Sequence, residues 1–387
     1  MDNTLLDNLK AYESDMHACF EWLHQNPDLP EHEQKTADFV ANLLESWGYD
    51  VAKGIGGTGI VATLAEGKGA HAIALRSELD ALPIQEDGTC RVVSKTPGVS
   101  HMCGHDGHMT MLLGAARYLA ETRNFSGTLR LVFQPAEEQM IGAQKMIADG
   151  LFERFPVEAI FGMHNSPNHE VGKIFLKKGP LLTAVDRLKI TVSGKGAHGA
   201  FPHQGIDPIV AASSIVAALQ SVVARNLNPL DTGVITVGTF HAGTAENIIP
   251  PSAELGLSVR SASPEGREVL LAHIDEIARL QAESYGATAR VENVQRGAVV
   301  VNDASLHEQV AAIATARLGE ENVDTQGFFE MASEDFAFYG ETVPSLFAMI
   351  GDGPSKINHN PGYVFNEDAL IHGAAYWVAL AEGLLKE

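Results

Sequence analysis

Residue types that bind metal ions are concentrated in one short segment, His101-Met102-Cys103-Gly104-His105-Asp106-Gly107-His108. A pair of carboxylates, Glu137-Glu138, follows this segment in the sequence. Thiolates, imidazoles and carboxylates are the usual protein ligands of zinc, and a carboxylate beside a metal-activated water can act as a general base. The two segments together predict metal-dependent hydrolysis.

The spacing within the first segment supports a metal site. Cys103 and His105 are separated only by Gly104, so a tight turn could direct both side chains to one point, while Asp106 and Gly107 open a helix. Taken alone, each such residue is more often a small buried thiol or a polar group at a helix start. We interpret the cluster as a metal site, because packing does not explain three histidines, a cysteine and an aspartate within eight residues.

Glu137 and Glu138 follow a predicted strand and a proline. Neighbouring side chains at a strand end diverge, so one carboxylate could bind metal while the other transfers protons. A lone Glu-Glu pair is equally common as a solvated group at a helix N-terminus, where the helix dipole stabilises it. The metal-binding segment favours the first interpretation.

Two further histidines, His164 and His359, each follow a predicted strand. Loops at strand ends gather ligands in open α/β sheets, so both could join Cys103, His105 and Glu138 in one shell. Five protein ligands exceed the tetrahedral coordination of one zinc ion. They suit two divalent ions that share a bridging ligand.

A later glycine-rich segment, residues 194–203, presents His198 and His203, and a structural turn is the default interpretation of such a stretch. Asn247 and Arg260 also stand out. Arg260 lies on an apolar predicted strand, where an unpaired guanidinium would be costly, so we expect a carboxylate partner from the protein or from a substrate.

The motif Gly54-Ile55-Gly56-Gly57-Thr58-Gly59 matches the dinucleotide-binding fingerprint by its letters. That fingerprint requires a helix immediately afterwards to receive the pyrophosphate, whereas residues 60–64 are predicted to form a strand. We therefore do not expect a nucleotide site there.

The periodicity of apolar residues predicts an α/β protein with a domain in which helices flank a central sheet. Its expected helices are 5–25, 33–47, 105–122, 141–149, 305–317 and 367–385, and its expected strands are 60–64, 71–75, 128–133, 159–163 and 345–350. The parallel strand ends of such a sheet would gather the residues above at one edge.

The order of elements changes in the middle of the chain to strand 186–192, helix 208–225, strands 233–240 and 253–261, helix 264–285 and strand 289–295. This βαββαβ order is the ferredoxin-like pattern. We therefore predict a discontinuous catalytic, metal-binding domain of residues 1–184 and 298–387, interrupted by an inserted domain of residues 185–297.

The amino-acid composition argues against two classes of binding partner, nucleic acids and anionic membranes. The 387 residues include 27 Lys and Arg against 49 Asp and Glu, a net charge of −22 that would repel nucleic acids and anionic membrane surfaces. The chain start lacks the features of a secretory signal, and no stretch approaches the ~20 apolar residues of a membrane span, so we expect a cytoplasmic location. Cys19, Cys90 and Cys103 have no framework spacing, which predicts reduced thiols.

Over nearly the whole chain, the order of these motifs resembles the co-catalytic metal aminoacylase and carboxypeptidase superfamily, in particular its amidohydrolase branch of hippurate hydrolases, N-acyl-amino-acid deacylases and plant auxin-conjugate hydrolases. The resemblance lies in the segments Arg76-Ser77-Glu78-Leu79-Asp80-Ala81-Leu82-Pro83, His101 to His108, Glu137-Glu138, Met163-His164-Asn165, 194–203, Asn247-Ile248-Ile249-Pro250, Met331-Ala332-Ser333-Glu334-Asp335-Phe336 and His359-Asn360-Pro361.

The resemblance implies a ligand set and a mechanism. Two divalent ions per subunit, zinc or manganese first and then cobalt or nickel, would be held by five residues: Cys103, His105, Glu138, His164 and His359. Glu137 would be the general base, and His198 would help to stabilise the oxyanion in the active site of the partner subunit. Asn247 and Arg260 would bind substrate. The fold implied is a metallopeptidase-like catalytic domain with a central mixed sheet flanked by helices. The inserted ferredoxin-like domain would act as a lid and as the surface of a homodimer.

The activity implied is hydrolysis of the amide bond of N-acyl-amino acids, which releases a carboxylic acid and a free amino acid. A dipeptidase and an aminobenzoyl-glutamate-type hydrolase use the same chemistry and differ in the acyl pocket. A catalytically inactive metal-binding or regulatory protein is the alternative from another class, and a purely structural module would leave the cysteine-histidine cluster unexplained.

The chain departs from the family pattern in two places. The family usually has Arg-Ala-Asp-x-Asp-Ala-Leu-Pro where this chain has Ser77 and Glu78, and Met102 replaces a common alanine. The longer carboxylate at position 78 puts in doubt the hydrogen bond by which the family residue at this position would orient a metal ligand.

Overall fold

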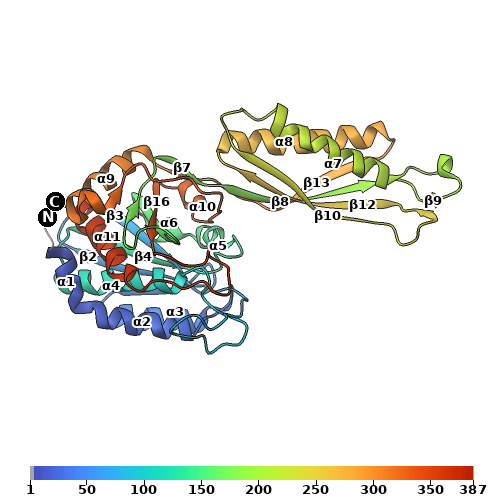
Figure 1. Ribbon diagram of the computed structural model, residues 1–387. Helices are drawn as coiled ribbons and strands as arrows, with labels where there is room; N and C mark the ends of the chain where they lie inside the picture. Colours follow the sequence, from blue (N-terminus) through green and yellow to red (C-terminus); the bar gives the residue numbers. More distant parts are fainter. Residues whose placement is uncertain (1–3, 387) are drawn as a thin grey trace. The chain divides into compact units, whose positions relative to one another are not determined.

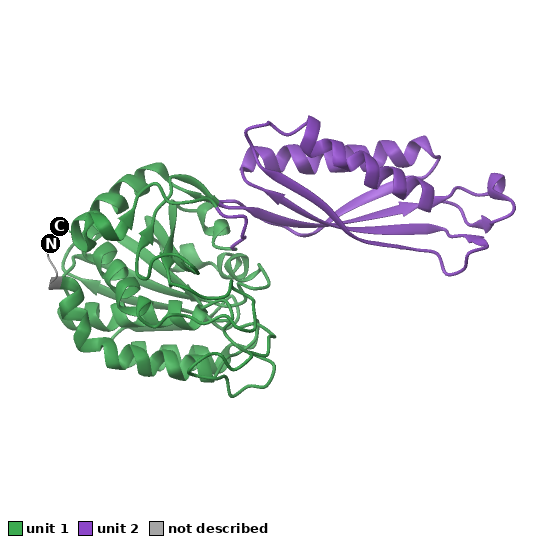
Figure 2. Ribbon diagram, viewed as in Figure 1, with its two compact units in different colours: residues 1–181, 301–329, 335–387 green, residues 182–300, 330–334 purple. Residues whose placement is uncertain are grey.

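A computed structural model describes residues 4–386, which form two compact units (Figure 2). Within the described chain, unit 1 consists of residues up to 181 together with 301–329 and the segment from 335 onward. Unit 2 consists of residues 182–300 and a short later segment, 330–334, which the sequence pattern did not assign to it.

Unit 1 is built on an eight-stranded mixed sheet in the order β1-β2-β4-β3-β5-β16-β6-β15 (Figure 1). Its strands are β1 Asp50–Ile55, β2 Gly59–Glu66, β3 Ala72–Glu78, β4 Gly127–Gln134, β5 Ala159–Ser166, β6 Ile174–Phe175, β15 Val323–Asp324 and β16 Ser345–Gly351. The central strands β4, β3, β5 and β16 run parallel, whereas β2 pairs antiparallel with β4. The ends of the four parallel strands therefore meet at one edge of the sheet, which is where α/β proteins place ligands.

Helices flank this sheet, as the sequence predicted. They are α1 Thr4–Leu9, α2 Glu13–Gln25, α3 Gln34–Ser46, α4 His105–Thr122, α5 Gly142–Ala148, α6 Leu151–Arg154, α9 Ala304–Leu318, α10 Ala337–Gly340 and α11 Ala369–Leu384. The core helices α4 and α11 are buried along nearly their whole lengths. They pack closely because Gly373 has no side chain: a Cβ there would lie 1.9 Å from the sulfur of Met111.

Unit 2 contains a four-stranded antiparallel sheet in the order β10-β12-β8-β13. Its long elements are β8 Ala184–Ser193, α7 Pro208–Arg225, β10 Gly233–Ala242, β12 Ser252–Ser261, α8 Pro264–Ser284 and β13 Thr288–Gln295. Burial alternates along β8 and β12, and both helices cover the same face of the sheet (Figure 1). The order of elements is thus βαββαβ.

By length and composition, α7 is apolar enough to cross a membrane, although our sequence reading found no such stretch. The buried residues of α7 recur at helical spacing, at Ala211, Ile215, Leu219 and Val222, and belong to the core beneath the helix. This pattern is that of a core helix that packs on a sheet.

The remaining strands are short: β7 Gly179–Leu182, β9 Ala197–His198, β11 Ile248–Ile249 and β14 Val300–Asn302. These, together with β6 and β15, were not predicted, because two to four residues carry no readable alternation. We also missed β1, and the single helix expected over 5–25 is interrupted by a 3-10 turn at Lys10–Tyr12.

The glycine-rich motif at 54–59 joins β1 to β2, which pair antiparallel as a hairpin. The structure therefore has a strand, and not a helix, directly after the motif, as expected. This geometry lacks the helix N-terminus that a dinucleotide fingerprint uses to bind pyrophosphate.

Candidate metal centre

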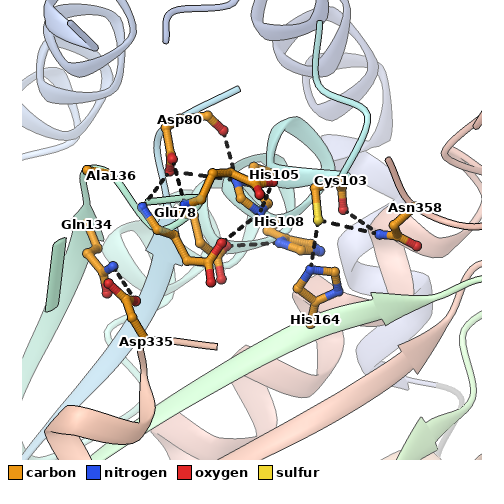
Figure 3. Close-up of polar contacts among 12 residues, drawn as sticks. Glu78, Asp80, Cys103, His105, His108, Gln134, Ala136, His164, Asp335 and Asn358 are labelled. Atoms are coloured by element: carbon orange, nitrogen blue, oxygen red, sulfur yellow. Dashed lines mark hydrogen bonds and ion pairs between the residues drawn. The ribbon is translucent and has the colours of Figure 1, made fainter. Parts of the chain in front are cut away.

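The five predicted metal ligands meet at the edge of the unit 1 sheet where the parallel strands end. His164 lies on β5, and Cys103 and His105 lie at the start of α4 (Figure 3). Glu138 follows β4 in the chain. Cys103 Sγ lies 3.4 Å from His164 Nε2, and His359 Nε2 lies 3.4 Å from Glu138 Oε2. Residues spread over most of unit 1 thus converge on one small volume.

The potential ligand atoms fall in overlapping groups of three, and two of these groups share one thiol. Cys103, His105 and His164 make one group, and Cys103, Glu138 and His359 make the other, with all ligand atoms of a group within 4.8 Å of one another. Metal–ligand bonds of about 2.0–2.3 Å place tetrahedral ligand atoms roughly 3.3–3.8 Å apart. The separations are close to this range, and Cys103 would be the one residue common to both groups if two ions were bound.

Two buried atoms in the centre lack any hydrogen-bond partner within the described chain, His105 Nε2 and Glu138 Oε1. They lie 3.9 Å apart, and an oxygen of Glu137 also lies 3.9 Å from His105 Nε2. A buried polar atom without a partner costs about 1–3 kcal/mol. A cation satisfies an imidazole lone pair and two carboxylate oxygens that lie 3.9 Å from it, so these residues fit a metal ion.

Hydrogen bonds behind the ligands fix the imidazoles in the orientation that metal binding needs. His105 Nδ1 lies 2.8 Å from the carbonyl oxygen of Asp80, and His164 Nδ1 lies 2.8 Å from that of Asn165. A carbonyl only accepts, so each Nδ1 carries the proton and donates it, which leaves each Nε2 as a free lone pair.

Backbone geometry directs the cysteine and the last histidine. Gly104 has φ +91° between Cys103 and α4, and a Cβ there would lie 2.7 Å from Asn165 Oδ1, so glycine is required. His359 also has a positive φ, +65°, and its N–H donates to the carbonyl of Met102 at 2.8 Å. That hydrogen bond joins the loop after β16 to the Cys103 segment.

A turn after β4 presents the two glutamates. Ala136 has φ +51°, and its N–H donates to Glu33 Oε1 at 2.8 Å. The next two N–H groups, of Glu137 and Glu138, donate to the two oxygens of Asp80 at 3.1 and 3.0 Å (Figure 3). Three successive N–H groups are thus held by two buried carboxylates, which is a backbone nest filled by the chain itself.

This turn differs from the expectation that Glu137 and Glu138 diverge as neighbours on a strand. Because the strand ends at Gln134, the left-handed residue Ala136 brings an oxygen of each glutamate to the same distance from His105 Nε2. Sequence reasoning also missed Glu33 and Asp80 as supports of the turn. Asp80 lies within segment 76–83, which resembles the family pattern, but no sequence signal connects Glu33 to this turn.

Glu78, the departure from the family pattern, is fully buried and points toward the centre from behind. Its Oε2 lies 2.9 Å from His108 Nδ1, and it forms an ion pair with the buried Arg76. The His108 ring packs edge-on against that of His164 at a centroid distance of 4.6 Å. His108 therefore supports a ligand, and the longer carboxylate still reaches it.

The pKa values of the ligands depart from their ordinary values. Burial and the charges of Glu138 and Glu137 raise the pKa of the Cys103 thiol well above its usual value. Burial and the charge of His108 lower the pKa of His164, whereas the hydrogen bond to Glu138 raises the pKa of His359. For Glu138, burial acts to raise the pKa, but His359 and His105 outweigh it and lower the pKa. A cation is needed to hold Cys103 as a thiolate.

The other predicted site residues lie in unit 2. His198 is exposed on β9, where its Nδ1 accepts the N–H of Ala200 at 3.0 Å, and the carbonyl of the exposed Asn247 accepts the N–H of Gly199 at 2.7 Å. Arg260 Nη1 donates to the carbonyl of Met331 at 2.7 Å and to Ser333 Oγ at 3.1 Å. The protein partners of Arg260 are thus a backbone carbonyl and a hydroxyl, and not the protein carboxylate that the sequence analysis offered as one possibility.

Comparisons with known proteins agree with this architecture. The family model described as Peptidase family M20/M25/M40 matches residues 74–383. The hippurate hydrolase of Campylobacter jejuni is 40% identical over 94% of this chain and 95% of its own length. The N-acetyl-L-cysteine deacetylase of Bacillus subtilis is 36% identical over 98% of this chain and 90% of its own length.

Among solved structures, the Bacillus subtilis YXEP protein, described as a dinuclear metal-binding peptidase of the M20 family, matches with a TM-score of 0.86 and 34% identity. The match covers 97% of this chain and 99% of that chain. The family match begins within β3 and ends within α11, so it spans all five predicted ligands, from Cys103 to His359. The chain therefore belongs to the peptidase family M20/M25/M40.

Proposed function

We propose that this chain is a metal-dependent amidohydrolase that cleaves the amide bond of N-acyl-amino acids and releases a carboxylic acid and a free amino acid. Relatives that match nearly its full length are named as a hippurate hydrolase and as an N-acetyl-L-cysteine deacetylase, and both names denote this reaction. The observation that carries the proposal is the pair of unsatisfied buried atoms, His105 Nε2 and Glu138 Oε1, inside two ligand groups that share Cys103.

Two divalent ions would occupy the centre. Cys103, His105 and His164 would hold one ion, and Cys103, Glu138 and His359 the other, in keeping with the dinuclear description of the Bacillus subtilis structure. A thiolate ligand favours zinc, while imidazole and carboxylate also accept manganese, cobalt or nickel, so zinc or manganese is our first choice. When bound, such ions polarise an acyl carbonyl and lower the pKa of water.

Glu137 is the proposed general base. It is buried and places an oxygen 3.9 Å from His105 Nε2, so its carboxylate lies beside the ligands without being needed in either group that contains Cys103. In this position Glu137 would take a proton from the attacking water and return it to the leaving amine. Its neighbour Glu138 would serve as a ligand, so the pair divides the two tasks.

Residues of unit 2 complete the proposal. His198 is exposed, as a residue that reaches into the active site of a partner subunit must be, and it would stabilise the oxyanion there in a homodimer formed through unit 2. Asn247 and Arg260 would bind the substrate, since a guanidinium suits the carboxylate of an N-acyl-amino acid. A cytoplasmic location remains part of this proposal.

The proposal is tested by stripping the protein with a chelator, reloading it with zinc or manganese, and measuring amine release. The substrates are N-benzoylglycine, N-acetylcysteine, an indoleacetyl-amino acid, a dipeptide and aminobenzoyl-glutamate. We expect activity on one or more of the first three, lost on stripping and restored by metal. Cleavage of the dipeptide or of aminobenzoyl-glutamate alone would replace the substrate class, and no cleavage by the fully loaded protein would contradict the enzyme assignment.

A further inference from the structure

A second cluster of metal-binding residue types lies outside the ligand set described above. It consists of His24 near the end of α2 and of Glu86 and Cys90 in the segment between β3 and α4. One potential ligand atom from each residue lies within 4.8 Å of the other two. His24 and Glu86 are buried, while Cys90 is half-buried, so the cluster has a path to solvent.

The contacts behind the cluster resemble those behind a metal ligand. His24 Nδ1 lies 2.6 Å from Asp106 Oδ2. The Nδ1–H can therefore donate a hydrogen bond to that carboxylate, while Nε2 faces Glu86 and the cluster. A histidine that binds a metal typically donates its other N–H to a carboxylate in this way. Glu86 is held similarly, because its Oε1 accepts the N–H of Ser94 and its Oε2 faces His24 Nε2 at 3.2 Å.

We propose that His24, Glu86 and Cys90 bind one further divalent ion of the zinc class, in addition to the two ions of the candidate metal centre. A thiolate, an imidazole and a carboxylate are the donor types that zinc selects, and three protein ligands leave a fourth position for water. The 3.2 Å separation of His24 Nε2 and Glu86 Oε2 is close to the roughly 3.3 Å between tetrahedral nitrogen and oxygen ligands.

The ion would replace protons. Binding releases the thiol proton of Cys90 and any proton on His24 Nε2, with no oxidation or reduction. A protonated His24, whose two ring N–H groups donate to Asp106 and Glu86, is the state that competes with metal binding. In that state the imidazolium, and not a metal ion, supplies the positive charge between the two carboxylates. A bound ion would connect α2 to the segment between β3 and α4, and His24 already contacts Asp106 in the first turn of α4.

The test compares Cys90→Ser with Cys19→Ser. Cys19 is also half-buried and is not one of the three residues of this cluster, so its replacement is a matched control. Zinc binding to the chelator-stripped full chain is measured by competition with a chromophoric chelator. We expect wild type and Cys19→Ser to bind one equivalent more than Cys90→Ser, or to bind it at least about ten-fold more tightly.

Cobalt makes the result independent of the candidate metal centre. In Cys103→Ser, thiolate-to-cobalt absorption should persist through Cys90, and it should disappear in the Cys90→Ser, Cys103→Ser double variant. If Cys90→Ser does not fold, as judged by circular dichroism, Glu86→Gln replaces it. Equal stoichiometry and affinity in the Cys90 and Cys19 variants, or no thiolate–cobalt absorption in Cys103→Ser, would overturn the proposal.

Discussion

At the residue scale, the division of labour between Glu137 and Glu138 is the feature that separates an enzyme from a metal-binding protein. Both approach His105, and with it they form one potential ligand group. The half-buried Glu138 also contacts His359 and belongs to a ligand group with Cys103. We therefore assign metal binding to Glu138 and proton transfer to the buried Glu137. Its replacement should affect turnover without emptying the centre.

Glu137→Gln should lower kcat by about 10²- to 10⁴-fold, because the amide has the shape of the carboxylate but cannot accept the proton of the attacking water. Metal content by mass spectrometry and the circular dichroism spectrum should match those of wild type. Full turnover in this variant would remove Glu137 from the mechanism, and loss of metal would reassign it as a ligand.

Metal affinity should fall as the pH falls. The pKa values of Cys103 and His359 are both raised, so each holds its proton at a higher pH than usual and must release it when an ion binds. Calorimetry in two buffers of different ionisation enthalpy should detect release of at least about one proton per chain near pH 7.5. Activity should decline on the acid side, and a flat profile down to pH ~5, below the ordinary histidine pKa, would contradict this.

The metal ligands and the general base could be predicted from the sequence more readily than the residues that hold them in place. Cys103, His105 and the glutamates stood out because of their types and close spacing, and His164 and His359 because each follows a strand. Glu33 could not be found in this way, since its role depends on a turn more than a hundred residues later in the chain. Such a contact becomes visible only when β2, β4 and α3 are placed together.

At the scale of elements, the turn between β4 and α5 determines where both glutamates point. Glu33, directly before α3, is fully buried and accepts the N–H groups of Glu31 and Ala136 and the hydroxyl of Thr58. These contacts join the α3 start, the β1–β2 hairpin and the turn itself. Glu33, which is not one of the five predicted ligands, thus stabilises the left-handed conformation of Ala136.

Glu33→Ala should weaken metal binding by about 10- to 100-fold and cost about 1–3 kcal/mol of unfolding free energy, because three donors lose their acceptor. Glu33→Gln keeps a carbonyl oxygen for the Ala136 N–H and should restore most of the metal affinity. Glu45→Ala removes an exposed carboxylate on α3 and serves as the control. Equal metal affinity in all three variants, measured by chelator competition, would show that Glu33 has no part in placing the turn.

The long elements were predictable because their apolar residues repeat over many positions. The helices α4, α7 and α8 and the strands β4, β8 and β12 lie within a few residues of their predicted limits. Short strands such as β6 and β15 exist because neighbouring strands supply their hydrogen bonds, which no local pattern reveals. The mixed sheet order likewise depends on pairing between distant segments.

At the scale of the whole molecule, the proposal requires two chains for one active site. His198 belongs to unit 2, whereas Glu137 and the metal ligands belong to unit 1. If His198 acts on the partner subunit, inactive variants of the two residues should complement each other when their subunits exchange.

Co-expression of Glu137→Gln with His198→Ala should therefore restore up to about one quarter of wild-type activity, the share of intact sites at random pairing in a two-fold dimer. Each variant alone should remain impaired. Sedimentation should show a dimer in every sample. Absence of recovery in a mixed dimer would place His198 in the active site of its own chain or outside catalysis.

The proposed hydrolase activity depends on two ions that share Cys103 as a ligand. The most direct measurement is an anomalous diffraction map of crystals loaded with zinc or manganese, collected on both sides of the metal absorption edge. We predict two peaks at this centre, about 3.5–4 Å apart with the Cys103 sulfur between them, one beside His105 and His164 and the other beside Glu138 and His359. An ion bound by His24, Glu86 and Cys90 would give a further, separate peak. A fully loaded crystal without anomalous density at Cys103 would contradict the account.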